Sequence, residues 1–210
     1  MVEPATNLDP GRIRSRLEEI REQAGPEVEI LAATKYVRSR DMGALAEAGV
    51  ELVGENRLQD LEAKHDDWGE RFTWDFIGNL QSRKVKRILP LVRLIHSVAS
   101  DSVLEQLGRH GGSDTEVLVE VNLSGEEEKG GIEPVALDEF IDRCPVTVSG
   151  LMTMPPFTED PEESRPYFAR LAELAAQRGL RRLSMGTSQD WRIAVEEGAT
   201  IVRLGSVLWA

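Results

Sequence analysis

The stretch Val28-Glu29-Ile30-Leu31-Ala32-Ala33-Thr34-Lys35 is typical of the first buried strand of a domain, and it ends on a lysine. Near the other end of the chain, Thr200-Ile201-Val202-Arg203-Leu204-Gly205-Ser206 has the pattern of a last strand followed by a small-residue turn. Helical patterns separate most of the apolar, β-rich runs. These runs lie near residues 28–34, 51–53, 72–77, 92–97, 115–123, 145–152, 181–185 and 200–204.

Eight strands that alternate with helices predict a single (β/α)₈ TIM barrel over residues 1–210. Ile13, Leu17 and Ile20 recur at helical spacing ahead of the first strand, so we expect an extra N-terminal helix. The alternative is an open, doubly wound sheet. Two features favour the barrel. No Gly-rich dinucleotide fingerprint follows the first strand, and small-residue turns suited to phosphate follow the seventh and eighth.

Composition excludes several classes of function. The 210 residues carry a formal net charge of −12, which disfavours nucleic acid as a partner. Cys144 is the only cysteine, so no intrachain disulfide or cysteine metal cluster is expected, and His65, His96 and His110 lack metal-ligand spacing. No apolar stretch is long enough to span a membrane, and the polar N-terminus has no apolar signal region. We therefore expect a cytoplasmic protein.

Closure of the barrel would bring the ends of the sequence together. Strand eight would then lie beside strand one, so Lys35 would meet Ser188, Arg203, Gly205 and Ser206. All five would lie at the C-terminal ends of the strands, where sites form in such barrels. This juxtaposition is the central prediction from the sequence.

The residue types at this end suggest a carbonyl site beside a phosphate site. Lysine attacks an aldehyde only as a neutral amine, and its ordinary pKa is about 10.4, so burial or nearby cations are expected around Lys35. Ser188 is expected in the first turn of a helix, where free N–H groups favour phosphate, and Gly205 and Ser206 would add donors. The alternatives are a surface lysine and ordinary helix caps.

Arg203 lies inside an apolar strand, so it needs a partner, either a structural ion pair or the ring nitrogen of a cofactor. Asn56, after the second strand, could contact a ring hydroxyl or cap a helix. Pyridoxal 5′-phosphate carries an aldehyde, a ring nitrogen and a phosphate together. It is therefore the cofactor that we predict for this site. An arginine at the ring nitrogen discourages protonation of the ring and argues against aminotransferase-like chemistry.

Several motifs occur in an order that resembles the YggS/PROSC family of pyridoxal phosphate homeostasis proteins. They are Ala32-Ala33-Thr34-Lys35, Gly54-Glu55-Asn56, Phe76-Ile77-Gly78-Asn79-Leu80-Gln81-Ser82-Arg83-Lys84, Val121-Asn122-Leu123-Ser124 with Lys129 and Gly131, Gly150-Leu151-Met152, Leu183-Ser184-Met185-Gly186-Thr187-Ser188 with Asp190, and Val202-Arg203-Leu204-Gly205-Ser206.

The resemblance implies a barrel like the N-terminal domain of alanine racemase, with the cofactor held as a Schiff base on Lys35. It further implies that Ser188, Gly205 and Ser206 hold the phosphate and that Arg203 faces the ring nitrogen. The family has no established catalytic turnover and is implicated in vitamin B6 and amino-acid homeostasis.

The chain departs from the family pattern at four positions. Asp75 stands where the family usually has histidine, and Thr187 replaces a methionine. Val37 replaces a second lysine, which puts any role of that amine in doubt, and Ser206 stands where threonine is commoner.

Three functions compete. The first is a cofactor-binding protein that delivers pyridoxal phosphate to apo-enzymes. It is favoured because the chain has no counterpart of the second, tyrosine-bearing domain of alanine racemase. That absence also predicts a monomer. Of the two tyrosines, Tyr36 should point to the other side of the strand from Lys35.

The second function is a pyridoxal-phosphate enzyme such as a weak racemase, with Asp75, Lys84 or Lys129 as general acid or base. The third is a cofactor-free barrel that acts on a sugar phosphate, with Lys35 attacking the substrate's carbonyl group.

Overall fold

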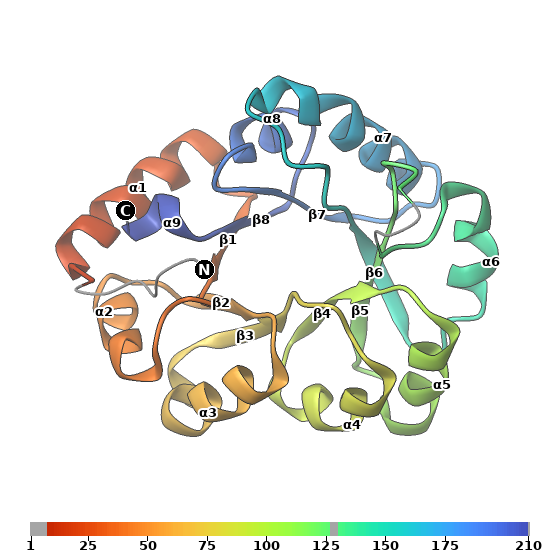
Figure 1. Ribbon diagram of the computed structural model, residues 1–210, viewed down its shortest axis with the longest axis horizontal. Helices are drawn as coiled ribbons and strands as arrows, with labels where there is room; N and C mark the ends of the chain where they lie inside the picture. Colours follow the sequence, from red (N-terminus) through yellow and green to blue (C-terminus); the bar gives the residue numbers. More distant parts are fainter. Residues whose placement is uncertain (1–7, 127–129, 210) are drawn as a thin grey trace.

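The computed structural model describes residues 8–126 and 130–209 and contains a closed barrel of eight parallel strands in sequence order (Figure 1). The predicted TIM barrel is therefore confirmed. The strands are β1 (Glu29–Ala33), β2 (Leu52–Glu55), β3 (Thr73–Phe76), β4 (Leu94–Val98), β5 (Glu116–Glu120), β6 (Thr147–Met152), β7 (Arg182–Thr187) and β8 (Ile201–Leu204).

Helices surround the barrel (Figure 1). They are α1 (Pro10–Ala24), α2 (Met42–Glu47), α3 (Leu58–Trp68), α4 (Val85–Ile88), α5 (Asp101–His110), α6 (Leu137–Asp142), α7 (Arg165–Ala176), α8 (Trp191–Glu196) and α9 (Ser206–Trp209). Short 3₁₀ turns lie at Ser39–Asp41, Gly69–Arg71, Ser82–Lys84, Leu89–Leu91, Pro134–Ala136 and Pro161–Ser164.

The predicted N-terminal helix is α1. The Asp9 side chain caps it by accepting hydrogen bonds from the backbone N–H groups of Gly11 and Arg12. Ile13, Leu17 and Ile20 are its buried residues, as the helical spacing indicated. The helix lies beside α9, so the two ends of the described chain pack against the same side of the barrel (Figure 1).

Pairing of β1 with β8 closes the barrel. Leu31 is opposite Arg203 and Ala32 is opposite Leu204, while Ala33 on the other edge of β1 is opposite Gly54 of β2. Side chains alternate across a strand, so Leu31 belongs to a cluster that includes Leu94 and Leu118, whereas Ala32 belongs to the larger cluster. The register places the residues after β1, β2 and β8 at one end of the barrel.

Gly150 gives a test of the β6–β7 pairing. A Cβ atom at Gly150 would lie 1.9 Å from the carbonyl oxygen of Arg182, its partner in the neighbouring strand. Gly150→Ala should therefore push the strands apart and lower the free energy of unfolding by about 3 kcal/mol, measured by denaturant unfolding.

Gly108 in α5 provides the matched control, because a Cβ there would meet Pro145 at an ordinary 3.5 Å. Gly108→Ala should stabilise the protein by about 0.5–1 kcal/mol, since alanine is the better helix former. Equal unfolding free energies for the two variants would contradict this account of Gly150.

Candidate functional site

Lys35 lies in a tight turn directly after β1. The turn is closed by a 2.8 Å hydrogen bond from the Val37 N–H to the Thr34 carbonyl, and Lys35 and Tyr36 occupy its centre. The Lys35 side chain is exposed, so of the two expected surroundings, burial or nearby cations, burial is wrong. Its Nζ atom lies 5.0 Å from the centroid of the Tyr36 ring. The prediction that Tyr36 points to the other side of the strand from Lys35 is also wrong, because the strand, with its alternating side chains, ends before this turn.

The two late turns meet each other and the end of β1. The Ser188 hydroxyl oxygen accepts hydrogen bonds from the backbone N–H groups of Gly205, at 2.9 Å, and Val207, at 3.4 Å. A Cβ atom at Gly205 would lie 3.8 Å from the carbonyl oxygen of Ala33 and 3.9 Å from Oγ of Ser188. Two backbone donors thus converge on one point, and a glycine keeps the space beside them open.

Ser188 is not part of a helix, which corrects the expectation that it lies in the first helical turn. The helix α8 begins three residues later, at Trp191. Asp190 holds the intervening turn, because its Oδ1 atom accepts hydrogen bonds from the N–H and the hydroxyl of Thr187 at 2.7 and 3.0 Å. Ser206 is the exposed first residue of α9.

Arg203 is buried in β8. Its guanidinium donates hydrogen bonds to the Ser184 hydroxyl at 2.6 Å and to the Thr153 carbonyl at 3.1 Å. Within the described residues it has no ion pair, so the structural ion pair weighed from the sequence is not found. Burial lowers the pKa of Arg203 to about 10, although the charges of Glu120 and Asp190 act in the opposite direction.

A chain of buried side chains extends from Arg203 into the barrel. Ser184 Oγ lies 2.8 Å from Nδ1 of His96, and Nε2 of His96 lies 3.1 Å from the Asp75 carboxylate. A carboxylate can only accept, so Nε2 carries the proton and Nδ1 accepts from the Ser184 hydroxyl. The Ser184 oxygen then accepts a hydrogen bond from Arg203. Each group in this network therefore donates to the next, from Arg203 through Ser184 and His96 to Asp75.

The charges along this chain fix its protonation. Burial lowers the pKa of His96, and the positive charges of Arg203 and Arg93 add to this effect, although Asp75 opposes it. Burial would raise the pKa of Asp75, but hydrogen bonds from His96 and Arg93 lower it below its ordinary value. We therefore assign a neutral His96 beside an ionised Asp75.

Arg93 extends the network toward the other end of the barrel. Its guanidinium binds both Asp75 oxygens, at 3.1 and 2.8 Å, and pairs with Glu29. Arg182 also pairs with Glu29, at 3.2 Å. Asp75 is fully engaged and buried, so it is not available as a general acid or base at the Lys35 end.

Sequence reasoning missed His96, Ser184 and Arg93, which the spacing of polar residues within apolar strands could have indicated.

Asn56 lies two residues beyond Gly54, as Lys35 lies two residues beyond its partner Ala33. The two residues therefore follow neighbouring strands at the same level. The Oδ1 atom of Asn56 is buried and has no hydrogen-bond partner among the residues that the structure describes. It does not cap a helix, since α3 has Arg57 at its N-cap position and no side-chain cap. A buried carbonyl oxygen without a partner is costly, so Asn56 is suited to a ligand.

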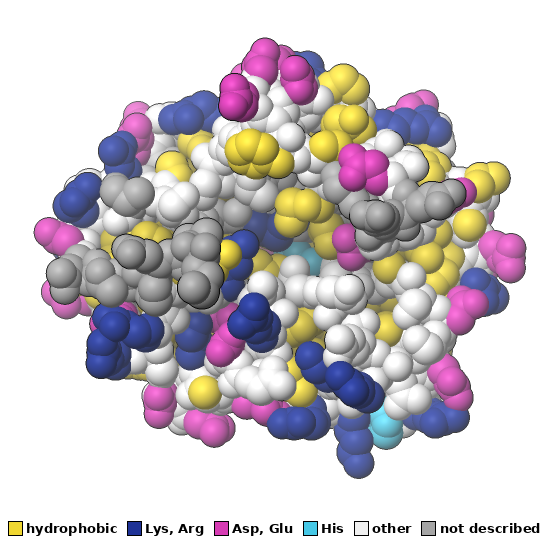
Figure 2. All heavy atoms as spheres, in the orientation of Figure 1, with side chains coloured by type: hydrophobic (Ala, Val, Ile, Leu, Met, Phe, Trp, Pro, Cys, Tyr) yellow, Lys and Arg dark blue, Asp and Glu magenta, His cyan; other side chains and the backbone are white. Residues whose placement is uncertain are grey.

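The barrel end that carries these residues has a recess at its centre (Figure 2). A cavity of about 170 Å³ lies there between Glu120, Asn122, Gly130 and Met154, and the Met154 sulfur is 3.8 Å from the Arg203 guanidinium. Burial raises the pKa of Glu120, while the charge of Arg203 lowers it less strongly. This cavity adjoins the buried Arg203 guanidinium.

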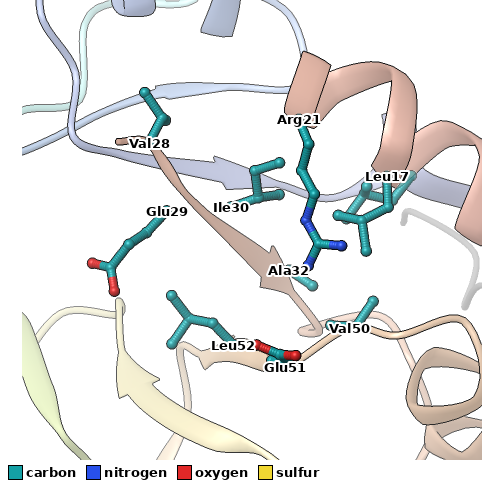
Figure 3. A pocket seen from close by; sticks show the side chains of 10 residues that line it. Leu17, Arg21, Val28, Glu29, Ile30, Ala32, Val50, Glu51 and Leu52 are labelled. Atoms are coloured by element: carbon teal, nitrogen blue, oxygen red, sulfur yellow. The ribbon is translucent and has the colours of Figure 1, made fainter. Parts of the chain in front are cut away.

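Another cavity, of about 180 Å³, lies by the start of β1 and β2, where Arg21 extends from α1 toward β1 (Figure 3). It is lined also by Glu29, Glu51 and Leu208 and by none of the site residues predicted from the sequence.

Among residues 8–126 and 130–209, no cluster of three or more His, Cys, Asp or Glu side chains is placed to hold a metal ion. The described helices include none long and apolar enough to cross a membrane.

The fold and the residues at the barrel mouth define a protein of the alanine racemase barrel class. The family model for the N-terminal domain of alanine racemase matches residues 8–210. The chain belongs to this family and, within it, to the pyridoxal phosphate homeostasis proteins. It is 39% identical to the protein of that name from Aquifex aeolicus over 94% of both chains, and 33% identical to that from Pseudomonas aeruginosa over 94% of this chain and 92% of the relative.

Solved structures agree with this assignment. PipY of Synechococcus elongatus, solved without and with pyridoxal phosphate bound, is 32% identical and has a TM-score of 0.83, with 94% of this chain and 100% of that chain covered. Alanine racemase from Corynebacterium glutamicum shares the fold at 16% identity and a TM-score of 0.75, with 96% of this chain and 60% of that chain covered.

The state of His96 predicts a pH dependence of stability. The unfolded chain binds the His96 proton near pH 6.5, whereas the folded chain binds it only at lower pH. The unfolded state therefore holds more protons below about pH 6.5, and the free energy of unfolding should fall as the pH decreases from 7 to 5. One such group contributes at most about 1.4 kcal/mol per pH unit.

His96→Gln should flatten this dependence, because glutamine can donate to Asp75 and accept from Ser184 without titrating. Denaturant unfolding at pH 7, 6 and 5 measures the effect. The control is His110→Gln, which removes an exposed histidine at the end of α5. A steep slope that survives in His96→Gln would show that the buried histidine is not its source.

Proposed function

We propose that this protein binds pyridoxal 5′-phosphate covalently through Lys35 and acts in vitamin B6 and amino-acid homeostasis without catalytic turnover. One observation carries the proposal: pairing of β1 with β8 puts the Lys35 turn, Arg203 and the convergent N–H groups of Gly205 and Val207 at one barrel end. The names of the relatives and the cofactor bound in PipY support it.

The residues present suit each part of the cofactor. The Gly205 and Val207 N–H groups now share the Ser188 hydroxyl oxygen, and all three could donate to a phosphate oxygen. Arg203 has no carboxylate partner among the described residues and is held in place by Ser184 and Thr153, so it suits the ring nitrogen. The unpartnered Oδ1 of Asn56 suits the ring's hydroxyl group.

Bound pyridoxal phosphate supplies an aldehyde, which condenses with a neutral lysine amine to a Schiff base with loss of one water. The Lys35 amine is accessible to such an aldehyde, because it is exposed and, in the described part of the chain, has neither an ion pair nor a hydrogen bond. Arg203 keeps its proton, since its pKa of about 10 is well above neutral pH. It would therefore leave a ring nitrogen unprotonated and the ring a poor electron sink.

The absence of turnover is part of the proposal. Asp75 is buried between His96 and Arg93, which removes one of the acid or base candidates considered from the sequence. Lys129 lies outside the described residues, and Lys84 lies in the 3₁₀ turn after β3. Tyr36 is a further group close to Lys35: the Lys35 Nζ atom lies 5.0 Å from the centroid of the Tyr36 ring. The Tyr36 side chain is partly open to solvent.

We also propose that the protein is a cytoplasmic monomer whose partners are apo-enzymes that require the cofactor. The support is indirect. The acidic net charge of −12 suits a protein that does not bind nucleic acid. The exposed Lys35 can exchange a bound aldehyde with free amines, which delivery requires.

Borohydride reduction after mixing with pyridoxal phosphate tests the attachment. The wild-type protein should gain a visible absorption band and, after reduction, a phosphopyridoxyl group on the peptide that contains Lys35. Lys35→Ala should lose both the band and the modification, because no other amine lies in this turn. Lys86→Ala, at an exposed position of α4, should keep both. Mass mapping that finds the group on another lysine would overturn the role of Lys35.

A stereochemical assay tests the lack of turnover. The cofactor-loaded protein, incubated with single enantiomers of amino acids, should show no sustained racemisation, because one lysine cannot move a proton between the two faces of a substrate. Tyr36→Phe should leave this result unchanged. Sustained racemisation that is lost in both Lys35→Ala and Tyr36→Phe would identify an enzyme with Tyr36 as its second acid or base.

A further inference from the structure

A second lysine lies buried beneath the turn that carries Lys35. Lys64 extends from α3, and its residue is only 5% exposed. The Nζ atom donates a hydrogen bond to the Thr34 carbonyl at 2.8 Å and forms an ion pair with Oε1 of Glu55. A buried ammonium needs such partners, and here one of them is the peptide group that leads into Lys35.

Glu55, at the end of β2, holds the same turn from another direction. Its Oε1 atom accepts a hydrogen bond from the Thr34 hydroxyl at 2.5 Å in addition to the ion pair with Lys64. Thr34 and Glu55 are both fully buried. Buried ion pairs contribute little net stability, because desolvation of both charges offsets their attraction. A role other than stability is therefore needed to explain why the Lys64–Glu55 pair lies beneath this turn.

The Thr34 carbonyl also closes the Lys35 turn, because it accepts the Val37 N–H at 2.8 Å. Lys64, Glu55 and the turn hydrogen bond thus fix Thr34 through its carbonyl and its hydroxyl group. The Lys35 side chain itself is exposed. A fixed backbone limits where a long, flexible side chain can bring its amine, and such orientation favours attack on a held aldehyde.

Lys64 cannot replace Lys35 as the nucleophile. An ammonium has three donors and no acceptor, and Lys64 directs two of its donors to Thr34 and Glu55 in a site with little exposure. Its Nζ atom is held in the ion pair with Glu55 and is not open to an incoming aldehyde, whereas attack on a carbonyl requires a free amine. The two lysines therefore divide the work between reaction and positioning.

We infer that Lys64, together with Glu55 and Thr34, positions the Lys35 turn so that its amine meets the cofactor aldehyde. Lys64 is a positioning residue, since it acts through Thr34 and not on the cofactor. The inference rests on the proposed function and assigns a role within it to a buried pair that lies outside the cofactor-binding set.

Two ligands separate positioning from general damage. Pyridoxal 5′-phosphate can bond to Lys35, whereas pyridoxine 5′-phosphate carries an alcohol in place of the aldehyde and can only bind non-covalently. In the double variant Lys64→Met/Glu55→Gln, which leaves no unpaired buried charge, affinity for pyridoxal phosphate should fall at least tenfold. Affinity for pyridoxine phosphate should change less than twofold. Thr34→Val should show the same selectivity with about a threefold loss, and Thr34→Ser should restore binding.

Lys86→Met, at an exposed position, is the control for loss of a lysine. Equal losses for both ligands, or no loss for either, would overturn the inference. If the double variant does not fold, the Thr34 variants decide the question. Thr34→Val removes the hydroxyl group that Glu55 accepts from, whereas Thr34→Ser keeps it. A wild-type protein that binds neither ligand would instead refute the proposed function, and the inference with it.

Discussion

Hydrogen bonding between β1 and β8 is the constraint on which the rest of the structure depends. It joins residues that are about as far apart in sequence as the chain allows, and it places the Ala33 carbonyl, at the end of β1, 3.8 Å from where a Cβ atom on Gly205 would lie. Without it, the turn that carries Lys35 and the turn that carries Gly205 would not lie at adjoining strand ends. With it, an amine, a guanidinium and two converging N–H groups share one barrel end. The geometry of the barrel thus creates the site, and no single motif does so alone.

Much of this could be predicted from sequence because the relevant signals are periodic. Eight apolar runs separated by helical patterns specify the barrel, and closure follows from its known geometry. The positions of Asn56 and Gly205 beyond strand ends also follow from this pattern. Local turns were harder: the three-residue spacing of Thr187 and Asp190 is that of a helix cap, yet the helix α8 begins only at Trp191, after the turn that this contact holds. The exposure of Lys35 was equally hard to predict, because it depends on the tight turn that the Val37 N–H closes by donating to the Thr34 carbonyl.

The buried polar groups could not be predicted as pairs. His96, Ser184 and Arg93 come from β4, β7 and the residue before β4, and only the completed barrel brings them to Asp75 and Arg203. Ser184 contacts the Arg203 guanidinium directly, and His96 in turn fixes the Ser184 hydroxyl. Lys64 and Glu55 have a comparable effect on the turn after β1. In both cases residues that do not touch a ligand restrict the ones that could.

Asp75 carries a consequence for how such barrels can diverge. Its two oxygens are the acceptors for His96 and Arg93 at once, so replacing it by a residue that only donates would leave His96 Nε2 without this acceptor and Arg93 with Glu29 alone. A histidine at this position would bring one acceptor nitrogen at most, where Asp75 offers two oxygens. A natural chain with that histidine must therefore fill the barrel axis with a different set of companions, so these positions are expected to exchange as a block and not one at a time.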